Sequence, residues 1–376
     1  MGFFGKVTRF VRRVLATINI VVILVMCACG YAGAFSPAAH PWTELLVLAF
    51  PVPFTLNILF FLVWLVVSPR YVLLPIIGLL LCWTPCRRYC PINKEGEPDD
   101  KCIKVMTFNV AAFNLCEKNT KRLNGVVEYL VDNPADITCL QESHLHNYHL
   151  GKFTDLLHPI YPYIYRANPQ KGETLTFLSK YPILDSEQIK YKTTRNTSWA
   201  CRMLVDGDTI LVVNSHLEST LLKQEDREEI SDILKKREIN TKERTILDKL
   251  CMAAVRRAPQ VDSLASYLER HRGMTTILCG DFNDTPNSYA YDRMAKYLDN
   301  AFEHTSTGMG HTYKNYHMNV RIDNIFLSPD LEAVKCKIDD KTHVSDHFPV
   351  ICWLKKRPKP YKNNNIPKEI FPKVKK

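Results

Sequence analysis

The sequence predicts a soluble domain of the α/β or α+β class that is preceded by two or three transmembrane helices. Two observations predict this fold class. Residues 1–90 are dominated by Leu, Val, Ile, Phe and Ala with few charges, whereas residues 91–376 have the mixed polarity of a soluble protein. Within the second part, short β-type runs are separated by helical patterns, which is typical of sheets covered by helices.

The apolar N-terminal part contains two uncharged runs that are long enough to cross a bilayer. Residues 15–35 would form a helix about 31 Å long, close to the thickness of a hydrocarbon core. Residues 45–68 form the second run, and its two prolines are tolerated in a membrane helix whose neighbours satisfy the freed backbone groups. A third stretch, within residues 70–84, is short for a full crossing and could be a tilted span or a re-entrant segment.

The basic residues around these runs predict the orientation. Arginines within residues 9–13 favour a cytoplasmic N-terminus, and Arg87 and Arg88 favour the same side for the end of the third stretch. Three spans would place the following domain outside, and two would place it inside. Because the first helix usually dominates, we expect three spans and a domain on the outer or periplasmic face of a cell or inner membrane. The alternative for residues 15–35 is a cleaved signal peptide, but a further apolar run follows it directly.

The net charge of +10 is concentrated at the two ends of the chain. Residues 1–13 carry +4 and residues 355–376 carry +8, which leaves −2 for residues 14–354. A nearly neutral domain is not expected to bind long nucleic acids tightly by charge. The basic ends suit the anionic head groups of a lipid bilayer instead.

The 13 cysteines are scattered without a repeated spacing, so we interpret most of them as small buried hydrophobic residues. Cys86 and Cys90 are the nearest to a pair, yet no further Cys or His nearby completes a zinc site.

A polar linker at residues 91–101 separates the membrane anchor, residues 1–90, from the folded domain, residues 102–354. A basic, proline-broken tail follows at residues 355–376, and we expect it to be disordered. Segment 222–250 mixes Lys and Glu, and it is either a solvated helix face or an element that binds a partner or gates a site. Strands are expected at residues 103–109, 137–142, 174–179, 209–216, 276–281, 324–328 and 349–354, and helices at 120–132, 222–250 and 258–272.

Polar residues recur at the carboxyl ends of these apolar runs. Asn109, Glu142, His216 and Asp281 each end a run and are followed by a loop. One such residue alone is more often a turn residue or a helix cap. Their recurrence in the same structural place indicates that the strands bring them to a common rim.

Seven short segments, taken in chain order, carry a resemblance to a known family. The chain resembles the endonuclease/exonuclease/phosphatase superfamily, which includes deoxyribonuclease I, exonuclease III, neutral sphingomyelinase and inositol polyphosphate 5-phosphatases. The resemblance implies a four-layered α-β-β-α sandwich of two packed mixed sheets and a metal-dependent phosphoester hydrolase. The segments are Met106-Thr-Phe-Asn109, Leu140-Gln-Glu142, Ser179-Lys-Tyr-Pro-Ile183, Asn214-Ser-His-Leu217, Gly280-Asp-Phe-Asn283, Arg321-Ile-Asp323 and Ser345-Asp-His347.

A hard divalent cation fits the carboxylates of this set, because phosphoester hydrolysis must neutralise the charge of the phosphate. The resemblance implies that Glu142 is the main ligand of Mg²⁺ or Mn²⁺, with Asn109 as an amide-oxygen ligand or orienting residue. Asp346 is a further candidate ligand. His144, His146 and His149 resemble a metal cluster, but their spacing fits no single helix face, so we expect a surface loop.

The remaining residues of the motifs suit proton transfer and phosphate binding. The resemblance pairs His347 with Asp323, and a histidine held by a carboxylate is a typical general base. Asp281 is the competing candidate for activating water, and His347 is the one that we favour from the sequence. Asn283 lies two residues after Asp281, so an extended segment would point both side chains to one face, toward water and a phosphate oxygen. His216 would donate to the phosphate or protonate the leaving group.

Two of the aspartates could instead have a purely structural role. Asp323 could instead form a salt bridge with Arg321 at the strand end. Asp284, beside Asn283, is expected to be a loop residue rather than a ligand.

The sequence thus predicts a membrane-anchored phosphoesterase that acts on a phosphodiester or phosphomonoester, either a lipid head group or a nucleotide or nucleic acid. The alternative is a catalytically inactive, membrane-bound scaffold or lipid-binding module with the same fold. No protein partner can be inferred from the sequence.

Overall fold

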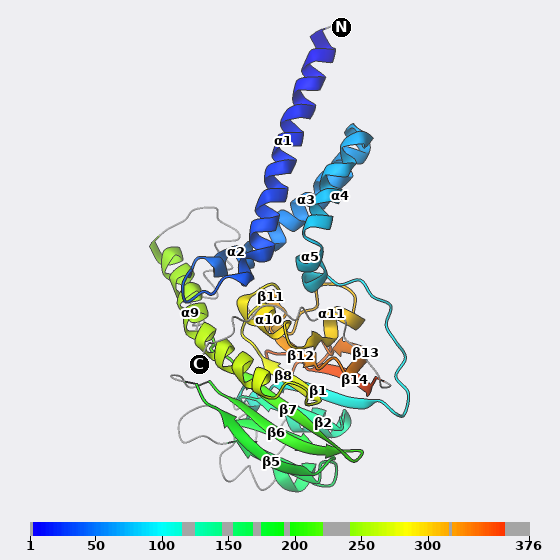
Figure 1. Cartoon of the computed structure of the whole chain (residues 1–376), viewed down its shortest axis with the longest axis vertical. Coiled ribbons are helices and arrows are strands. Elements are labelled where there is room, and N and C mark those ends of the chain that lie inside the picture. The colour runs from blue at the N-terminus through cyan, green and yellow to red at the C-terminus, as the bar shows by residue number, and fades with distance from the viewer. Residues whose placement is uncertain are drawn as a thin grey trace, which may run out of the picture.

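The computed structural model describes residues 3–114, 125–144, 153–167, 174–191, 196–220, 241–315 and 318–357. Figure 1 shows a stalk of N-terminal helices that projects from a layered domain. The N-terminus lies at the end of the stalk that is far from the domain. The domain begins after α5 and contains all of the described strands.

The stalk runs toward the domain, away from it and back again (Figure 1). Two of its stretches, Val7–Ala34 and Thr43–Val67, are long and apolar enough to cross a membrane. The pair Pro69–Leu81 and Trp83–Tyr89 is bent by 74° and would be a third span only if counted together. The elements are α1 (Phe3–Tyr31), η1 (Ala32–Ala34), α2 (Thr43–Ala49), α3 (Pro51–Val67), η2 (Pro69–Val72), α4 (Leu73–Leu81) and α5 (Trp83–Tyr89).

A buried polar cluster joins the three long passes of the stalk. Asn19 of α1 donates to Asn57 of α3 (3.3 Å), and Asn57 donates to the carbonyl of Pro75 in α4 (3.0 Å). The indole N–H of Trp64 donates to Asn19 (3.0 Å). Hydrogen bonds of this kind hold apolar helices together where the hydrophobic effect gives no preference for helix contact over lipid contact.

The domain is built on two six-stranded mixed sheets with the orders β13-β14-β1-β2-β4-β3 and β5-β6-β7-β8-β12-β9. A small antiparallel pair, β10-β11, stands apart from them. The strands are β1 (Ile103–Asn109), β2 (Ile137–Gln141), β3 (Tyr163–Ala167), β4 (Leu175–Ser179), β5 (Ile183–Ile189), β6 (Ser198–Val205), β7 (Asp208–His216), β8 (Thr276–Asp281), β9 (Asp299–Asn300), β10 (Tyr313–Asn315), β11 (Met318–Val320), β12 (Asp323–Leu327), β13 (Leu331–Ile338) and β14 (Val350–Lys356).

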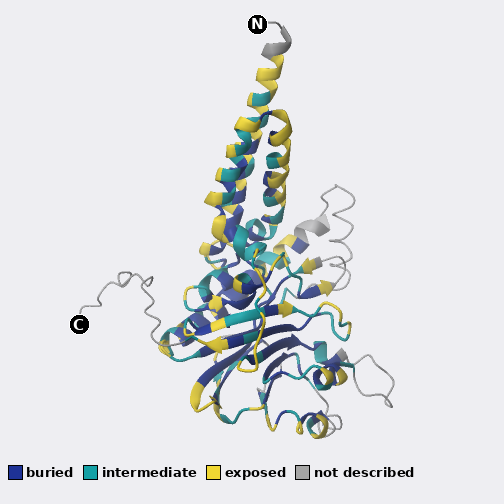
Figure 2. Ribbon diagram, turned by 90° about the vertical axis from the view of Figure 1, so that its right-hand side faces the viewer, coloured by how far each residue is buried: buried dark blue, intermediate teal, exposed yellow. Residues whose placement is uncertain are grey.

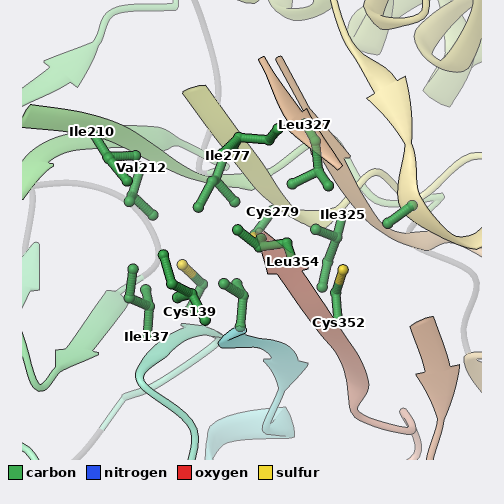
Figure 3. Close-up of a cluster of buried hydrophobic side chains, with 14 of the residues drawn as sticks. Ile137, Cys139, Ile210, Val212, Ile277, Cys279, Ile325, Leu327, Cys352 and Leu354 are labelled. Carbon is green, nitrogen blue, oxygen red and sulfur yellow. The ribbon is translucent and has the colours of Figure 1, made fainter. Parts of the chain in front are cut away.

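The core lies between the two sheets, and alternate strand residues face it. Figure 3 shows Ile137 and Cys139 of β2 packed across from Val212 of β7 and from Ile277 and Cys279 of β8. Figure 2 shows most strand residues as buried, in contrast to the exposed surface of the stalk.

Helices cover the outer face of each sheet. Met106 and Phe108 of β1 pack against α6 (Gly125–Asp132), and Leu211 and Val213 of β7 pack in a cluster with α9 (Thr241–Arg270) and α10 (Tyr289–Met294). The molecule therefore has the predicted four layers: helix, sheet, sheet and helices. Two further elements, η3 (Ala111–Asn114) and α11 (Ala301–Thr305), lie in connections between strands.

The seven predicted strands are all present, with ends that differ by up to two residues. Four strands of five to eight residues were not predicted, namely β3, β5, β6 and β13. In β5 and β13 several charged residues hide the alternation of a strand. The prediction of separate helices at 222–250 and 258–272 was wrong: from Thr241 onward α9 is one helix that continues through Pro259. The other predictions for residues 120–124, 222–240 and 358–376, and those for His146 and His149, lie outside the described residues.

The stalk contacts the domain directly. Gly33 of η1 lies against the backbone of Asn287 and Ser288, where a Cβ atom would find no space. The side chain of Asn287 donates to the carbonyl of Pro85 in α5 (3.1 Å). Arg88 forms an ion pair with Asp292 of α10 (3.1 Å). The anchor and the domain are thus packed together rather than joined only by the linker.

Candidate functional site

Five predicted site residues lie where strands of both sheets end. Asn109 is the last residue of β1, Glu142 follows β2, and His216 and Asp281 end β7 and β8. Asp323 is the first residue of β12, which runs antiparallel to β8. In the strand register Asp281 therefore lies beside His216 on one neighbour and beside Asp323 on the other. The sheet ladder, rather than any loop, brings these three side chains together.

The amide of Asn109 bridges two carboxylates. Its Nδ2 donates to Glu142 Oε1 and to Asp281 Oδ2, both at 3.0 Å. Its Oδ1 accepts from the N–H of Ala111 (3.1 Å), which fixes the orientation of the amide. Glu142 has a φ of 50°, so the chain turns sharply after β2 and leaves its side chain 35% exposed, whereas Asp281 is almost fully buried.

Two histidines flank Asp281. The Nε2 atoms of His216 and His347 each lie 3.7 Å from Asp281 Oδ2. His216 Nε2 also lies 3.8 Å from Glu142 Oε1. Asp281 is thus the centre of the cluster, in contact with an amide and two imidazoles.

His347 is held by Asp323 on its other side. Its Nδ1 lies 2.9 Å from Asp323 Oδ2, and the ring packs on Tyr313 with centroids 4.8 Å apart. Burial disfavours a charge on His347, but the carboxylates of Asp323 and Asp281 outweigh this effect and raise its pKa to about 10. The imidazole therefore carries a positive charge at neutral pH. The salt bridge between Asp323 and Arg321, considered above as an alternative, is not what the structure shows. Arg321 donates to the carbonyls of Met309 and Arg88.

The surroundings of Asp281 disfavour its negative charge. Burial, reinforced by the nearby carboxylate of Asp323, raises the pKa of Asp281 to about 6, although His347 and His216 act against this shift. A carboxylate with a pKa close to neutral can both lose and accept a proton under physiological conditions.

The predicted geometry of Asn283 was wrong. Asn283 has a φ of 50° and lies beyond the end of β8, so the segment after Asp281 does not continue as an extended strand. The side chain donates to the carbonyl of Leu217 (3.0 Å), and the N–H donates to Asp281 Oδ1 (2.8 Å). Asn283 therefore joins the two loops that follow β7 and β8.

Other predicted residues lie at the edge of the cluster or outside it. Asp346 is half-buried and is near enough to His347 to favour its positive charge, but its one described side-chain hydrogen bond is with Ser345 (3.5 Å). Its role as a ligand remains a prediction. Asp284 is not an ordinary loop residue, because it is buried and its Oδ2 lies 3.4 Å from Arg257 Nε. His144 contacts the hydroxyl of Thr174 (2.9 Å).

No role was predicted from the sequence for the buried residues that connect the two sheets next to the cluster. Gln141 donates to Asn214 (2.7 Å), and Asn214 donates to the carbonyl of Leu140 (3.0 Å), which ties β2 of one sheet to β7 of the other. Arg257 and Glu44, which contact each other, were also missed. A signal existed for Arg257, since Ala253, Ala254, Ala258 and Val261 place it on the buried stripe of α9.

The cluster is suited to a hard cation. Glu142, Asp281 and Asp323 supply three carboxylates against one charged imidazole, and oxygen atoms are the preferred ligands of Mg²⁺ and Mn²⁺. Among the described residues, none donates a hydrogen bond to the buried Oδ1 atom of Asp323. Asp281, Asp323 and His347 also offer ligand atoms that lie within 4.8 Å of one another.

Comparison of the sequence with family profiles identifies the chain. The profile described as the endonuclease/exonuclease/phosphatase family matches residues 106–347, from the strand that carries Asn109 to His347. The chain belongs to this family. It is a phosphoester hydrolase of the endonuclease/exonuclease/phosphatase type, and enzymes of this family use a divalent metal ion. A second profile, of a domain of unknown function, matches the stalk over residues 12–89. Comparison with curated protein sequences gives no match.

The solved structure of nocturnin agrees with the fold. The catalytic domain of human nocturnin, with a bound sulfate anion, is 18% identical, with a TM-score of 0.50 over 68% of this chain and 94% of its own. TDP2 of D. rerio, humanized by 14 mutations, is 18% identical, with a TM-score of 0.49 over 68% of this chain and 100% of its own. The 3′ phosphatase NExo of Neisseria, bound to a product DNA hairpin, is 18% identical, with a TM-score of 0.46 over 66% and 98% of the two chains. At this identity the likeness to nocturnin shows the fold alone.

Proposed function

We propose that this endonuclease/exonuclease/phosphatase protein is a membrane-anchored enzyme that uses Mg²⁺ or Mn²⁺ to hydrolyse a phosphoester held close to a lipid bilayer. The observation that carries the chemical part is the convergence of Glu142, Asn109 and Asp281 from both sheets, with a histidine on each side of Asp281.

Glu142 is our candidate for holding the cation, with Asn109 as a ligand or orienting group. We prefer this side of Asp281 to the side of His347, because both ring nitrogens of His347 face carboxylates and its charge repels a cation. The partly exposed side chain of Glu142 leaves this side open to a substrate. When bound, the cation would neutralise the charge of the phosphate and polarise its oxygen atoms.

The protein side chains would then divide the proton transfers. Asp281 would accept the proton of the attacking water, because its raised pKa makes it a stronger base than an ordinary aspartate. His347, charged and held by Asp323, would stabilise the negative charge that develops on the phosphate. His216 would donate a proton to the leaving oxygen. This assignment replaces His347 with Asp281 as the base that we favour.

Three features support a bilayer around the stalk and a substrate near it. Two stretches of the stalk are long enough to span a membrane, and they expose large apolar side chains such as Leu24, Leu59 and Val66. The loop after Asp281 rests on the end of this stalk through Asn287, Gly33 and Pro85. A small cavity of about 70 Å³ is lined jointly by Val47 and Leu48 of the stalk and by loop residues that include Thr285 and Arg321.

The path of the stalk supports placement of the N-terminus and the domain on opposite sides of the membrane. Because the chain runs down, up and down again, its N-terminus and its domain lie at opposite ends of the stalk (Figure 1). With Arg9, Arg12 and Arg13 on the cytoplasmic side, the domain would lie on the outer or periplasmic side.

A substrate panel with the full chain in lipid nanodiscs tests this proposal. The panel contains bis-p-nitrophenyl phosphate, a phospholipid, a nucleotide and an oligonucleotide, each with Mg²⁺, Mn²⁺ or EDTA. We expect hydrolysis that EDTA removes and that Glu142→Gln lowers by about 100-fold or more. Glu187→Gln, which alters an exposed carboxylate of β5, is the matched control and should leave the rate unchanged. Folded wild-type protein that hydrolyses none of these compounds would favour the inactive scaffold instead.

A further inference from the structure

Glu44 is the one carboxylate among residues 1–94, and it is buried. It lies in α2, at the start of the second apolar stretch, and only 4% of its side chain is exposed. A lone acid in an apolar segment is costly to bury and is retained where it has a specific partner. Its partner here comes from the soluble domain.

That partner is Arg257 of α9, which is buried. Helix α9 contacts α2, the helix that carries Glu44. Arg257 Nη2 lies 3.7 Å from Glu44 Oε1, and Arg257 Nε lies 3.4 Å from Asp284 Oδ2. One guanidinium thus joins a carboxylate of the anchor to a carboxylate of the loop that follows Asp281. Because all three side chains are buried, solvent screens these interactions little.

The third nitrogen of the same guanidinium holds the backbone of two loops. Arg257 Nη1 donates to the carbonyl of Asn283, two residues after Asp281, and to the carbonyl of Glu218 (3.4 Å), two residues after His216. The loops also bond to each other, since the N–H of Leu217 donates to the carbonyl of Asp281 (3.0 Å). Gln260, one turn along α9, accepts from the N–H of Glu218 (2.8 Å).

We propose that Glu44 and Arg257 are positioning residues for catalysis, so that the membrane anchor completes the active site of the domain. Glu44 and Asp284 orient the guanidinium, and the guanidinium fixes the backbone on which Asp281 and His216 are mounted. This inference rests on the proposed function. A domain without α2 has lost one of the two carboxyl groups that contact Arg257, so its loops are held less firmly and its catalytic groups are less well aligned.

The test uses the full chain in nanodiscs and bis-p-nitrophenyl phosphate, a water-soluble substrate whose access does not depend on the bilayer. Glu44→Gln keeps the shape of the side chain and replaces the carboxyl group, which pairs with Arg257, by an amide. We expect it to lower kcat by about tenfold while KM changes less than twofold, because a misplaced catalytic group slows the chemical step more than binding. Glu44→Asp restores a carboxyl group and should recover part of the kcat.

The matched control is Arg88→Gln, which removes another ion pair between the anchor and the domain but does not touch the two catalytic loops. It should lower the melting temperature without lowering kcat. A Glu44→Gln enzyme with wild-type kcat, or with a loss that Arg88→Gln reproduces, would overturn the proposal. If Glu44→Gln does not fold, Asp284→Asn and Arg257→Lys test the same cluster from the domain side, and wild-type kcat in both would overturn it. An inactive wild-type protein would instead count against the proposed function.

Discussion

At the scale of single residues, the site depends on how one buried carboxylate is surrounded. Asp281 contacts the amide of Asn109 and the rings of His216 and His347. Asp323, opposite Asp281 in the strand register, keeps His347 charged. Removing any one of these groups leaves another buried polar group without compensation, which costs more than the lost contact itself.

Asp323→Asn should lower kcat by about 100-fold or more while the overall structure remains unchanged. The amide keeps the shape of the carboxylate but no longer favours the positive charge, so the pKa of His347 falls and its electrostatic contribution is lost. Steady-state kinetics and an NMR titration of His347 check both parts. The control is Asp339→Asn, because Asp339 lies away from the site and accepts a hydrogen bond from the hydroxyl of Tyr129 (2.7 Å). An unchanged pKa of His347 would contradict this account.

The affinity for Mn²⁺ should fall as the pH is lowered through about 6. Burial and Asp323 raise the pKa of Asp281 to about 6, so below this pH the carboxyl is neutral and no longer attracts the cation that Glu142 would hold beside it. Above it the carboxylate is charged, and affinity should level off. Calorimetric titration between pH 5 and pH 8 (about three units) measures this, and Asp281→Asn should bind weakly with a flatter pH dependence. Affinity that does not vary with pH in the wild type would show that the charge of Asp281 does not support the cation.

The sequence pointed to the side chains that meet in the candidate site because each ends an apolar run or belongs to a short motif. It could not identify Glu44 and Arg257, which contact each other across more than two hundred residues of chain. Nor could it place the side chain of Asn283, since a positive φ at a residue other than glycine is uncommon and reverses the direction in which the side chain points. The charge of His347 depends on two partners from different strands, which no local pattern shows.

At the scale of elements, the parallel pair β7 and β8 sets the spacing of the site. Gly280 comes just before Asp281 and has a φ of 146°, and a Cβ atom there would overlap the carbonyl of Ser215. The glycine in Gly280-Asp-Phe-Asn283 therefore lets the two strands approach where His216 and Asp281 must lie side by side.

Gly280→Ala should consequently lower the melting temperature far more than Gly207→Ala. Gly207 also has a positive φ, 86°, but no atom lies within 4 Å of its would-be Cβ. The change at Gly207 should cost only the backbone strain, about 1–2 kcal/mol, whereas the change at Gly280 adds a steric overlap with backbone. Thermal melting of both variants in detergent provides the comparison. Equal shifts in melting temperature would show that close strand approach is unimportant.

Element prediction succeeded for central strands and failed mainly toward the edges of the sheets. The central strands β1, β2, β7 and β8 read as largely apolar runs because both of their faces are covered. At the edges, β5 and β13 carry Asp185, Glu187, Lys335 and Lys337, which hide the alternation of a strand. The predicted break between residues 250 and 258 is absent, because α9 is continuous from Thr241 to Arg270.

At the scale of the whole molecule, the stalk and the domain form one packed unit, with contacts from η1, α2 and α5 to the loops around the site. The charge distribution fits the same picture, since the part between the basic ends carries only −2. Such a surface gives little attraction for a polyanion, whereas the basic ends favour an anionic membrane.

External protease should remove a tag from the C-terminus but not from the N-terminus in sealed right-side-out vesicles. If the stalk crosses the membrane three times, as proposed, the N-terminus and the domain lie on opposite sides, and the arginines near residue 10 favour the cytoplasm for the N-terminus. Detergent should expose both tags to the protease, which serves as the control. Tags that are cleaved together, or protected together, would contradict three passes.

The pairing of Glu44 with Arg257 also implies an order of biogenesis. A ribosome makes Glu44 long before it makes Arg257, so in the proposed membrane-anchored protein the stalk would enter the membrane while Glu44 still lacks its partner. Only the completed and folded domain supplies the guanidinium. We therefore expect a chain stalled or truncated before α9 to keep an uncompensated acid at the membrane surface, a mark by which quality control could distinguish unfinished molecules from finished ones.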